Sequence, residues 1–104
     1  MSEFNNATIV KKANVYFEGN VVSRTVKLDD GSIKTLGFML PGEYEFNTES
    51  AEVMEILAGR LDVLLANTSE WMEVKGGESF NVPAHSVFKL KIYDATDYCC
   101  SFVG

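Results

Sequence analysis

The chain has 104 residues, of which 46% are hydrophobic and 23% charged, and its formal net charge is −6. This length fits one domain with its own core, and the acidic balance excludes the broad basic surface that nucleic acids and anionic membranes attract. No apolar run approaches the length of a membrane span, and the first residues lack the hydrophobic core of a signal peptide, so we expect a cytoplasmic protein.

Short β-prone runs separated by Gly, Pro, Asn and Asp dominate the sequence, and helical periodicity is nearly absent. Residues 1–13 are predicted to form a flexible N-terminal arm, followed by one domain over residues 14–104. Within this domain we predict strands at 14–18, 21–28, 32–40, 43–48, 52–58, 61–66, 70–74, 78–82, 86–93 and 96–103. Tight turns are expected at Asp30-Gly31, Pro41-Gly42, Gly59-Arg60 and Gly76-Gly77. Many short strands at even spacing indicate an all-β sandwich or a closed roll.

The alternation of side chains predicts which faces of these strands are buried. Within 86–93, Phe88, Leu90 and Ile92 point away from two intervening lysines, and within 96–103 the side chains at 98, 100 and 102 share a face. The segments 52–58 and 61–66 are apolar on both faces, which indicates that something covers them from outside. A second copy of the chain is the simplest cover, so we expect a homodimer; the alternative is that the N-terminal arm covers them.

Most familiar catalytic constellations are missing from the sequence. Gly76-Gly77 lacks the spacing and the lysine of a phosphate-binding loop, and no serine sits in a nucleophile elbow. A single histidine excludes a two-histidine metal site, so we expect neither a metal nor another cofactor. A dyad of His85 with Cys99 or Cys100 is open in principle, although adjacent cysteines in an apolar strand are more often core residues. Two unpaired thiols suit a reducing compartment.

Two segments carry a recognisable pattern: PGEYEFNTESAEVMEILAGRLDV from Pro41 and GGESFNVPAHSVFKL from Gly76. Glu52 and Gly59 keep the spacing that ends the first cupin motif, and Gly77 and Pro83 keep the spacing that begins the second. The chain therefore resembles the cupin family, which implies a jelly-roll barrel of the RmlC-like type. The three histidine positions that bind metal in cupins fall on Phe46, Thr48 and Phe88, and His85 takes the place of a motif glycine. The resemblance thus implies a barrel with an aromatic interior and no metal site.

A closer resemblance rests on several strings: YFEG from Tyr16, GEYEF from Gly42, LDVLL from Leu61, and FNVPAHSVFKL from Phe80. They are similar to the small cupins of the pyrimidine/purine nucleoside phosphorylase family, from about Tyr16 to Cys100. This resemblance implies a pentosyltransferase that uses inorganic phosphate to cleave purine and pyrimidine nucleosides into free base and (deoxy)ribose 1-phosphate. It also implies broad tolerance of the base and a metal-free homodimer. The alternatives are a cupin that binds a small molecule without turnover and a metal-dependent oxygenase, which the missing histidines disfavour.

The expected reaction passes through a sugar with oxocarbenium character, so it needs a positioned phosphate and the exclusion of water. Glu52 is the first catalytic candidate, because a carboxylate at this motif position would bind ribose hydroxyls or stabilise the charged sugar. His85 is the second, as a donor to phosphate or an acid for the leaving base. For both, the alternative is a purely structural role.

The predicted substrate-binding residues fall into two groups. Tyr44, Phe46 and Phe88 would form a platform for the base and the sugar, with Met54 packing beside them. Phosphate needs donors, and the candidates are Arg24, Arg60 and Lys34, with Ser23 and Thr48 as neutral partners. The alternative is that the aromatic residues are only core and that Arg60 is only solvated.

Overall fold

The computed structural model describes residues 3–103, so the outer ends of the predicted arm and domain, residues 1–2 and 104, lie outside the described residues. The described residues contain a short 3₁₀ turn, η1 (Phe17–Gly19), and no helix in this range is long and apolar enough to cross a membrane. The strands are β1 (Thr8–Ile9), β2 (Asn14–Tyr16), β3 (Val21–Lys27), β4 (Ile33–Met39), β5 (Gly42–Asn47), β6 (Ala51–Leu64), β7 (Met72–Lys75), β8 (Ser79–Val82) and β9 (Val87–Val103).

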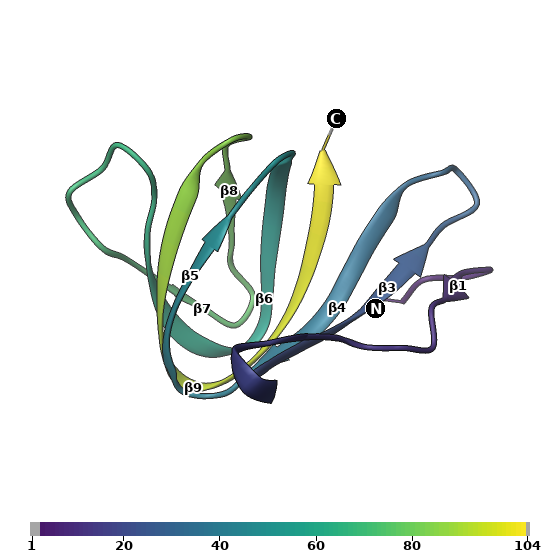
Figure 1. Ribbon diagram of the computed structural model, residues 1–104, viewed down its shortest axis with the longest axis horizontal. Coiled ribbons are helices and arrows are strands. Elements are labelled where there is room, and N and C mark those ends of the chain that lie inside the picture. Colours follow the sequence, from purple (N-terminus) through teal and green to yellow (C-terminus); the bar gives the residue numbers. More distant parts are fainter. Residues whose placement is uncertain (1–2, 104) are drawn as a thin grey trace.

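Two long strands, β6 and β9, form the frame of the fold and pair antiparallel along most of their length. The second half of β6 and the first half of β9 lie between β7 and β5, which together make one wall. The other halves lie between β8 and β4, and this second wall continues through β3 to β1 and β2. Both long strands curve through the bottom of the view as they pass from one wall to the other (Figure 1).

A β-bulge at Gly59 makes the bend in β6. Gly59 has φ +106°, and the register between β6 and β9 shifts several times between Ile56 and Leu61. An added Cβ would lie 2.5 Å from Oγ1 of Thr96 on β9, so only glycine fits this close approach. The prediction of a tight turn at Gly59-Arg60 was therefore wrong, because a glycine with positive φ serves a bulge as readily as a turn. The segments 52–58 and 61–66 are one strand, as are 86–93 and 96–103.

The closed barrel that the sequence predicts does not form. In the described residues the sheet has free ends, because β5 pairs only with β9, β7 and β8 pair only with β6, and β1 and β2 pair only with β3. The walls are instead held together by side chains in the space between them. Phe46 of β5 packs on Phe17 of η1, with ring centroids 5.4 Å apart, and Phe17 also contacts Tyr44. Packing of two facing sheets, with strands that switch between them at bulges, replaces hydrogen-bonded closure.

The core between the walls follows the predicted alternation. Phe88, Leu90 and Ile92 are buried, while Lys89 is exposed. Cys99 and Cys100 are both buried and unpaired. The described part of the N-terminal arm pairs with β3 through β1, and β4 and β9 separate it from β6 in the sheet.

Candidate functional site

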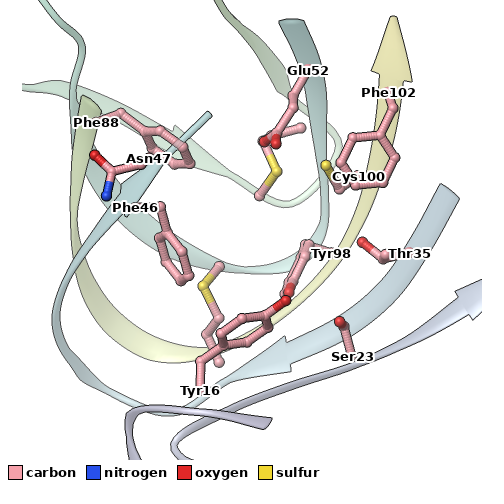
Figure 2. Close-up of a pocket in the computed structure, with 12 residues that line it drawn as sticks. Tyr16, Ser23, Thr35, Phe46, Asn47, Glu52, Phe88, Tyr98, Cys100 and Phe102 are labelled. Carbon is pink, nitrogen blue, oxygen red and sulfur yellow. The ribbon is translucent and has the colours of Figure 1, made fainter. Parts of the chain in front are cut away.

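A cavity of about 190 Å³ opens between the two walls. Its lining comes from β2, β3, β4, β5, β6 and β9, so it forms only when both walls are assembled. Figure 2 shows two differently composed sides, with Phe46 and Phe88 on one and Ser23, Thr35 and Tyr98 on the other. The lining residues are Tyr16, Ser23, Thr35, Met39, Phe46, Asn47, Glu52, Met54, Phe88, Tyr98, Cys100 and Phe102.

Stacked phenyl rings form the aromatic side of the pocket. Phe46 and Phe88 face each other across the β5–β9 pair, with ring centroids 5.7 Å apart and an interplanar angle of 25°. Phe80 packs edge-on against Phe88 at 6.4 Å, and Tyr16 of β2 packs edge-on against Phe46 at 6.0 Å. Aromatic faces arranged in this way suit a flat ring-shaped ligand.

Three hydroxyl side chains on adjacent strands form the opposite side, and we call Ser23, Thr35 and Tyr98 the hydroxyl cluster. Ser23 of β3 and Tyr98 of β9 are both in register with Gly37 of β4, which lies between them. An added Cβ at Gly37 would lie 2.5 Å from both Cζ and Oη of Tyr98. The missing side chain therefore lets the Tyr98 ring lie across β4, with its hydroxyl towards Ser23.

The hydroxyls of this cluster are able to donate hydrogen bonds. Nδ2 of Asn14 donates to Oγ of Ser23 at 3.2 Å, and Ser23 also hydrogen-bonds with Tyr98, which acts against the effect of burial on the Tyr98 pKa. Burial raises the pKa of Tyr98 to about 12, so its hydroxyl stays protonated near neutral pH. Thr35 lies opposite Cys100 in the β4–β9 register, and its side chain hydrogen-bonds with the Cys100 thiol.

Glu52 reaches into the pocket from β6 and is half-buried (Figure 2). Burial raises the pKa of its carboxyl group, and a hydrogen bond with Cys100 acts in the opposite direction. For Cys100, burial first and the Glu52 carboxylate second raise the pKa of the thiol to about 12. A reactive cysteine needs the reverse environment, and His85 does not line this pocket. The Cys–His dyad that the sequence left open therefore has no geometric support here.

Five of the residues predicted for the site come together in this pocket, because Ser23, Phe46, Glu52, Met54 and Phe88 all line it. Thr48 and Tyr44 are buried beside it and bond to the backbone. Oγ1 of Thr48 donates to the Pro83 carbonyl at 2.7 Å, and Oη of Tyr44 donates to the Leu40 carbonyl, also at 2.7 Å.

The predicted cations and the histidine lie elsewhere. Arg24 is exposed on β3 and lines a shallow groove outside the walls. Arg60 pairs with Glu73 at 3.6 Å and with Asp94 at 3.8 Å. His85 is exposed in the turn before β9. Nζ of Lys34 donates to Oγ of Ser101 at 2.7 Å. Accordingly, no lysine, arginine or histidine is among the lining residues within the range 3–103.

Sequence reasoning missed half of the pocket. The alternation in 96–103 placed Tyr98, Cys100 and Phe102 on one face, which is the face that lines the cavity. That pattern was the available signal, but it did not reveal that this face meets Glu52. Tyr16 was expected in a strand and given no role, and Thr35 was not singled out.

The positions of the cupin metal ligands do not fit a metal ion. Rings of Phe46 and Phe88 occupy two of them, and the third, Thr48, turns to the backbone. Between residues 3 and 103, no group of three or more His, Cys, Asp and Glu side chains is placed to hold one.

Comparisons with a family model and with curated proteins agree on one family. Residues 11–102 match the family model described as pyrimidine/purine nucleoside phosphorylase. A protein of that name from Geotalea uraniireducens (strain Rf4) is 63% identical over 103 residues, covering 99% of this chain and 99% of the relative. Another from Wolinella succinogenes is 61% identical over 104 residues, covering 100% of this chain and 99% of the relative. These matches confirm the resemblance seen in the sequence.

Solved structures support the fold. A protein of unknown function from Acinetobacter sp. ADP1 superposes with a TM-score of 0.94 at 40% identity, covering 97% of this chain and 98% of that one. An RmlC-like cupin from Shewanella frigidimarina NCIMB 400 has a TM-score of 0.70 at 16% identity, covering 97% and 86%. The second likeness concerns the fold alone, and it confirms the predicted cupin-type architecture.

Proposed function

The chain belongs to the pyrimidine/purine nucleoside phosphorylase family, and we propose that it uses inorganic phosphate to cleave purine and pyrimidine nucleosides into free base and (deoxy)ribose 1-phosphate. The observation that carries this proposal is the composition of the pocket. Stacked phenyl rings, a half-buried carboxylate and a group of hydroxyls converge on one cavity. These are groups that a flat base, a sugar with developing positive charge and an oxyanion require.

The aromatic side is assigned to the base. Phe46 is half-buried and lines the pocket, and the buried Phe88 stacks against it. Neither ring carries a hydrogen-bonding group, so this surface packs on a purine or a pyrimidine alike. The cavity of about 190 Å³ is smaller than the roughly 300–1,000 Å³ of most small-molecule pockets. Part of the substrate would therefore lie at the mouth, where Tyr16 and Phe102 line the pocket and are 45% and 43% exposed.

Glu52 is assigned to the sugar. A phosphate oxygen attacks C1′ of the pentose while the bond from C1′ to the base breaks and the base takes the electron pair. Positive charge develops on the sugar, and the Glu52 carboxylate stabilises it from β6. The proton of hydrogen phosphate ends on the released base, so the overall reaction balances without a cofactor.

Release of free base from uridine and adenosine, with and without phosphate, tests the activity. Release only with phosphate, accompanied by a sugar 1-phosphate, is expected. Glu52→Gln should lower turnover by about 10²–10³-fold, because it removes a charge from the transition state. Glu55→Gln is the matched control, because Glu55 is exposed on the same strand and does not line the pocket. Equal turnover in both variants would remove Glu52 from the mechanism.

The roles predicted from the sequence for the other candidates remain predictions, because their side chains do not line the pocket. They are the catalytic role of His85 and the substrate contacts of Tyr44, Thr48, Arg24 and Arg60. Single alanine variants in the same base-release assay test them individually.

One observation favours a second function, a cupin that binds a small molecule without turnover. Within the described residues the pocket lining contains no cation to hold phosphate. Absence of base release from every nucleoside, with retained nucleoside binding, would establish this alternative.

We also propose that the chain is a homodimer. Leu36 and Phe38 of β4 line the groove on the outer face of β3 and β4 and are 38% and 46% exposed, and Leu57 of β6 is 44% exposed. Apolar side chains of this size on an outer sheet face are typical of protein interfaces. Light scattering should give twice the mass of the chain, and Phe38→Glu should halve it; a monomeric wild type would contradict the proposal.

The buried, unpaired thiols of Cys99 and Cys100 support a reducing compartment, and we propose the cytoplasm. Cell fractionation tests this, and recovery outside the cytoplasmic fraction would overturn it.

A further inference from the structure

The pocket poses an electrostatic problem for a phosphorylase. Phosphate must enter a cavity that contains a carboxylate and, among the described residues, no lining cation. The nearest candidates in sequence, Arg24 and Lys34, directly follow Ser23 and precede Thr35, so their side chains lie on the opposite face of the sheet. Arg24 lines the outer groove, and Lys34 donates to Ser101. Within residues 3–103, the pocket lining therefore offers an oxyanion neutral donors alone.

We propose that the hydroxyl cluster, Ser23, Thr35 and Tyr98, donates hydrogen bonds to inorganic phosphate, and that Glu52 accepts a hydrogen bond from a P–OH group of the same ion. The pocket then selects an oxyanion that carries a proton. This inference rests on the proposed function, since it assigns the phosphate subsite of that reaction.

The donors are placed for this task. They come from three neighbouring strands, so their hydroxyls converge from one side of the cavity (Figure 2). Asn14 donates to Oγ of Ser23, so the Ser23 proton is directed away from Asn14, towards the Tyr98 hydroxyl and the pocket. Gly37 lets the Tyr98 ring lie across β4, where its hydroxyl faces Ser23. Neutral donors of this kind bind an anion without a full positive charge, in the way that oriented dipoles do.

Glu52 supplies the selectivity. A carboxylate repels any anion that can only accept hydrogen bonds, but it forms a short charge-assisted bond with a P–OH group. Phosphate near neutral pH keeps at least one such proton, and arsenate does the same. Sulfate has none at this pH, so Glu52 would exclude it despite its similar size and shape.

Phosphorus NMR titration of the full chain with inorganic phosphate tests the site without requiring turnover. We expect phosphate to bind and sulfate in about tenfold excess not to displace it. In Glu52→Gln the amide donates to sulfate, so sulfate should compete with phosphate at similar concentrations. Sulfate that competes equally with the wild type, or no phosphate binding at all, would overturn the inference.

Removal of single hydroxyls tests the donors. Tyr98→Phe should weaken phosphate binding about tenfold, the loss of one hydrogen bond to a charged group. Thr35→Val should act in the same direction and provides a second test if Tyr98→Phe does not fold. Tyr93→Phe is the control, because its hydroxyl bonds to Asp62 at 2.6 Å on the exposed surface. Unchanged phosphate binding in both pocket variants would refute the assignment.

The two proposals fail in distinguishable ways. If the protein releases base but Tyr98→Phe and Thr35→Val bind phosphate as tightly as the wild type, the proposed subsite is wrong and the phosphorylase proposal stands. If the protein binds phosphate selectively but releases base from no nucleoside, the subsite proposal stands and the phosphorylase proposal is wrong.

Discussion

Replacement of Gly37 by alanine tests how the pocket holds its hydroxyls. The new Cβ would lie 2.5 Å from Cζ and Oη of Tyr98, whereas carbon atoms in contact are about 3.5–4.0 Å apart. The ring must therefore move by about 1 Å, and the Tyr98 hydroxyl moves with it. Overpacking of this size costs roughly 1–3 kcal/mol. Alanine recovers about 0.4–1 kcal/mol by restricting the unfolded chain. The net loss of unfolding free energy for Gly37→Ala therefore lies between about 0 and 2.6 kcal/mol, and we expect a value near the middle of this range, about 1–2 kcal/mol.

Urea denaturation measures this loss, and phosphate titration measures its effect on the site. Phosphate binding should weaken together with stability, because the displaced hydroxyl is one of the proposed donors. In the double variant Gly37→Ala with Tyr98→Leu, the clash disappears, so the two changes should not add. An alanine variant as stable as the wild type, with unchanged phosphate binding, would refute the reasoning.

Two more predictions concern stability. Thr48→Val removes the hydroxyl that donates to the Pro83 carbonyl and accepts from the Ser86 amide, so urea denaturation should show a loss of about 1–3 kcal/mol; no loss would mean that water replaces these bonds. Burial raises the pKa values of Tyr98 and Cys100 to about 12 from ordinary values of 10.0 and 9.0, so the folded state keeps protons that the unfolded chain releases. Their contribution to stability should be complete below pH 9.0 and should be lost as the pH rises through about 12. Tyr98→Phe should flatten this alkaline decline, and parallel curves for the variant and the wild type would contradict the assignment.

The sequence was sufficient for the parts of the site that depend on local pattern. Strict alternation predicted the burial of Phe88, and motif spacing brought Glu52 together with Phe46 and Phe88. The turn at Asp30-Gly31 links β3 to β4 and thereby fixes Ser23 opposite Gly37.

The hydroxyl cluster required information that no local pattern contains. Tyr98 meets Gly37 only because β9 pairs with β4 in one register across some sixty residues of chain. A shift by one residue would turn Tyr98 to the other face of the sheet. The bulge at Gly59 was equally hidden, because the close approach to Thr96 that requires glycine exists only after β6 and β9 have paired.

The passage of β6 and β9 through both walls limits how a ligand can enter. Since each long strand is continuous across the bend and belongs to both walls, the walls separate only if the pairing of β6 with β9 at the bend changes. A nucleoside must therefore enter and leave past the rim, through rotation of side chains such as Tyr16 and Phe102. We therefore expect the rate of substrate entry and product release to depend on the side-chain movements of Tyr16 and Phe102, with little change in the backbone of β6 and β9.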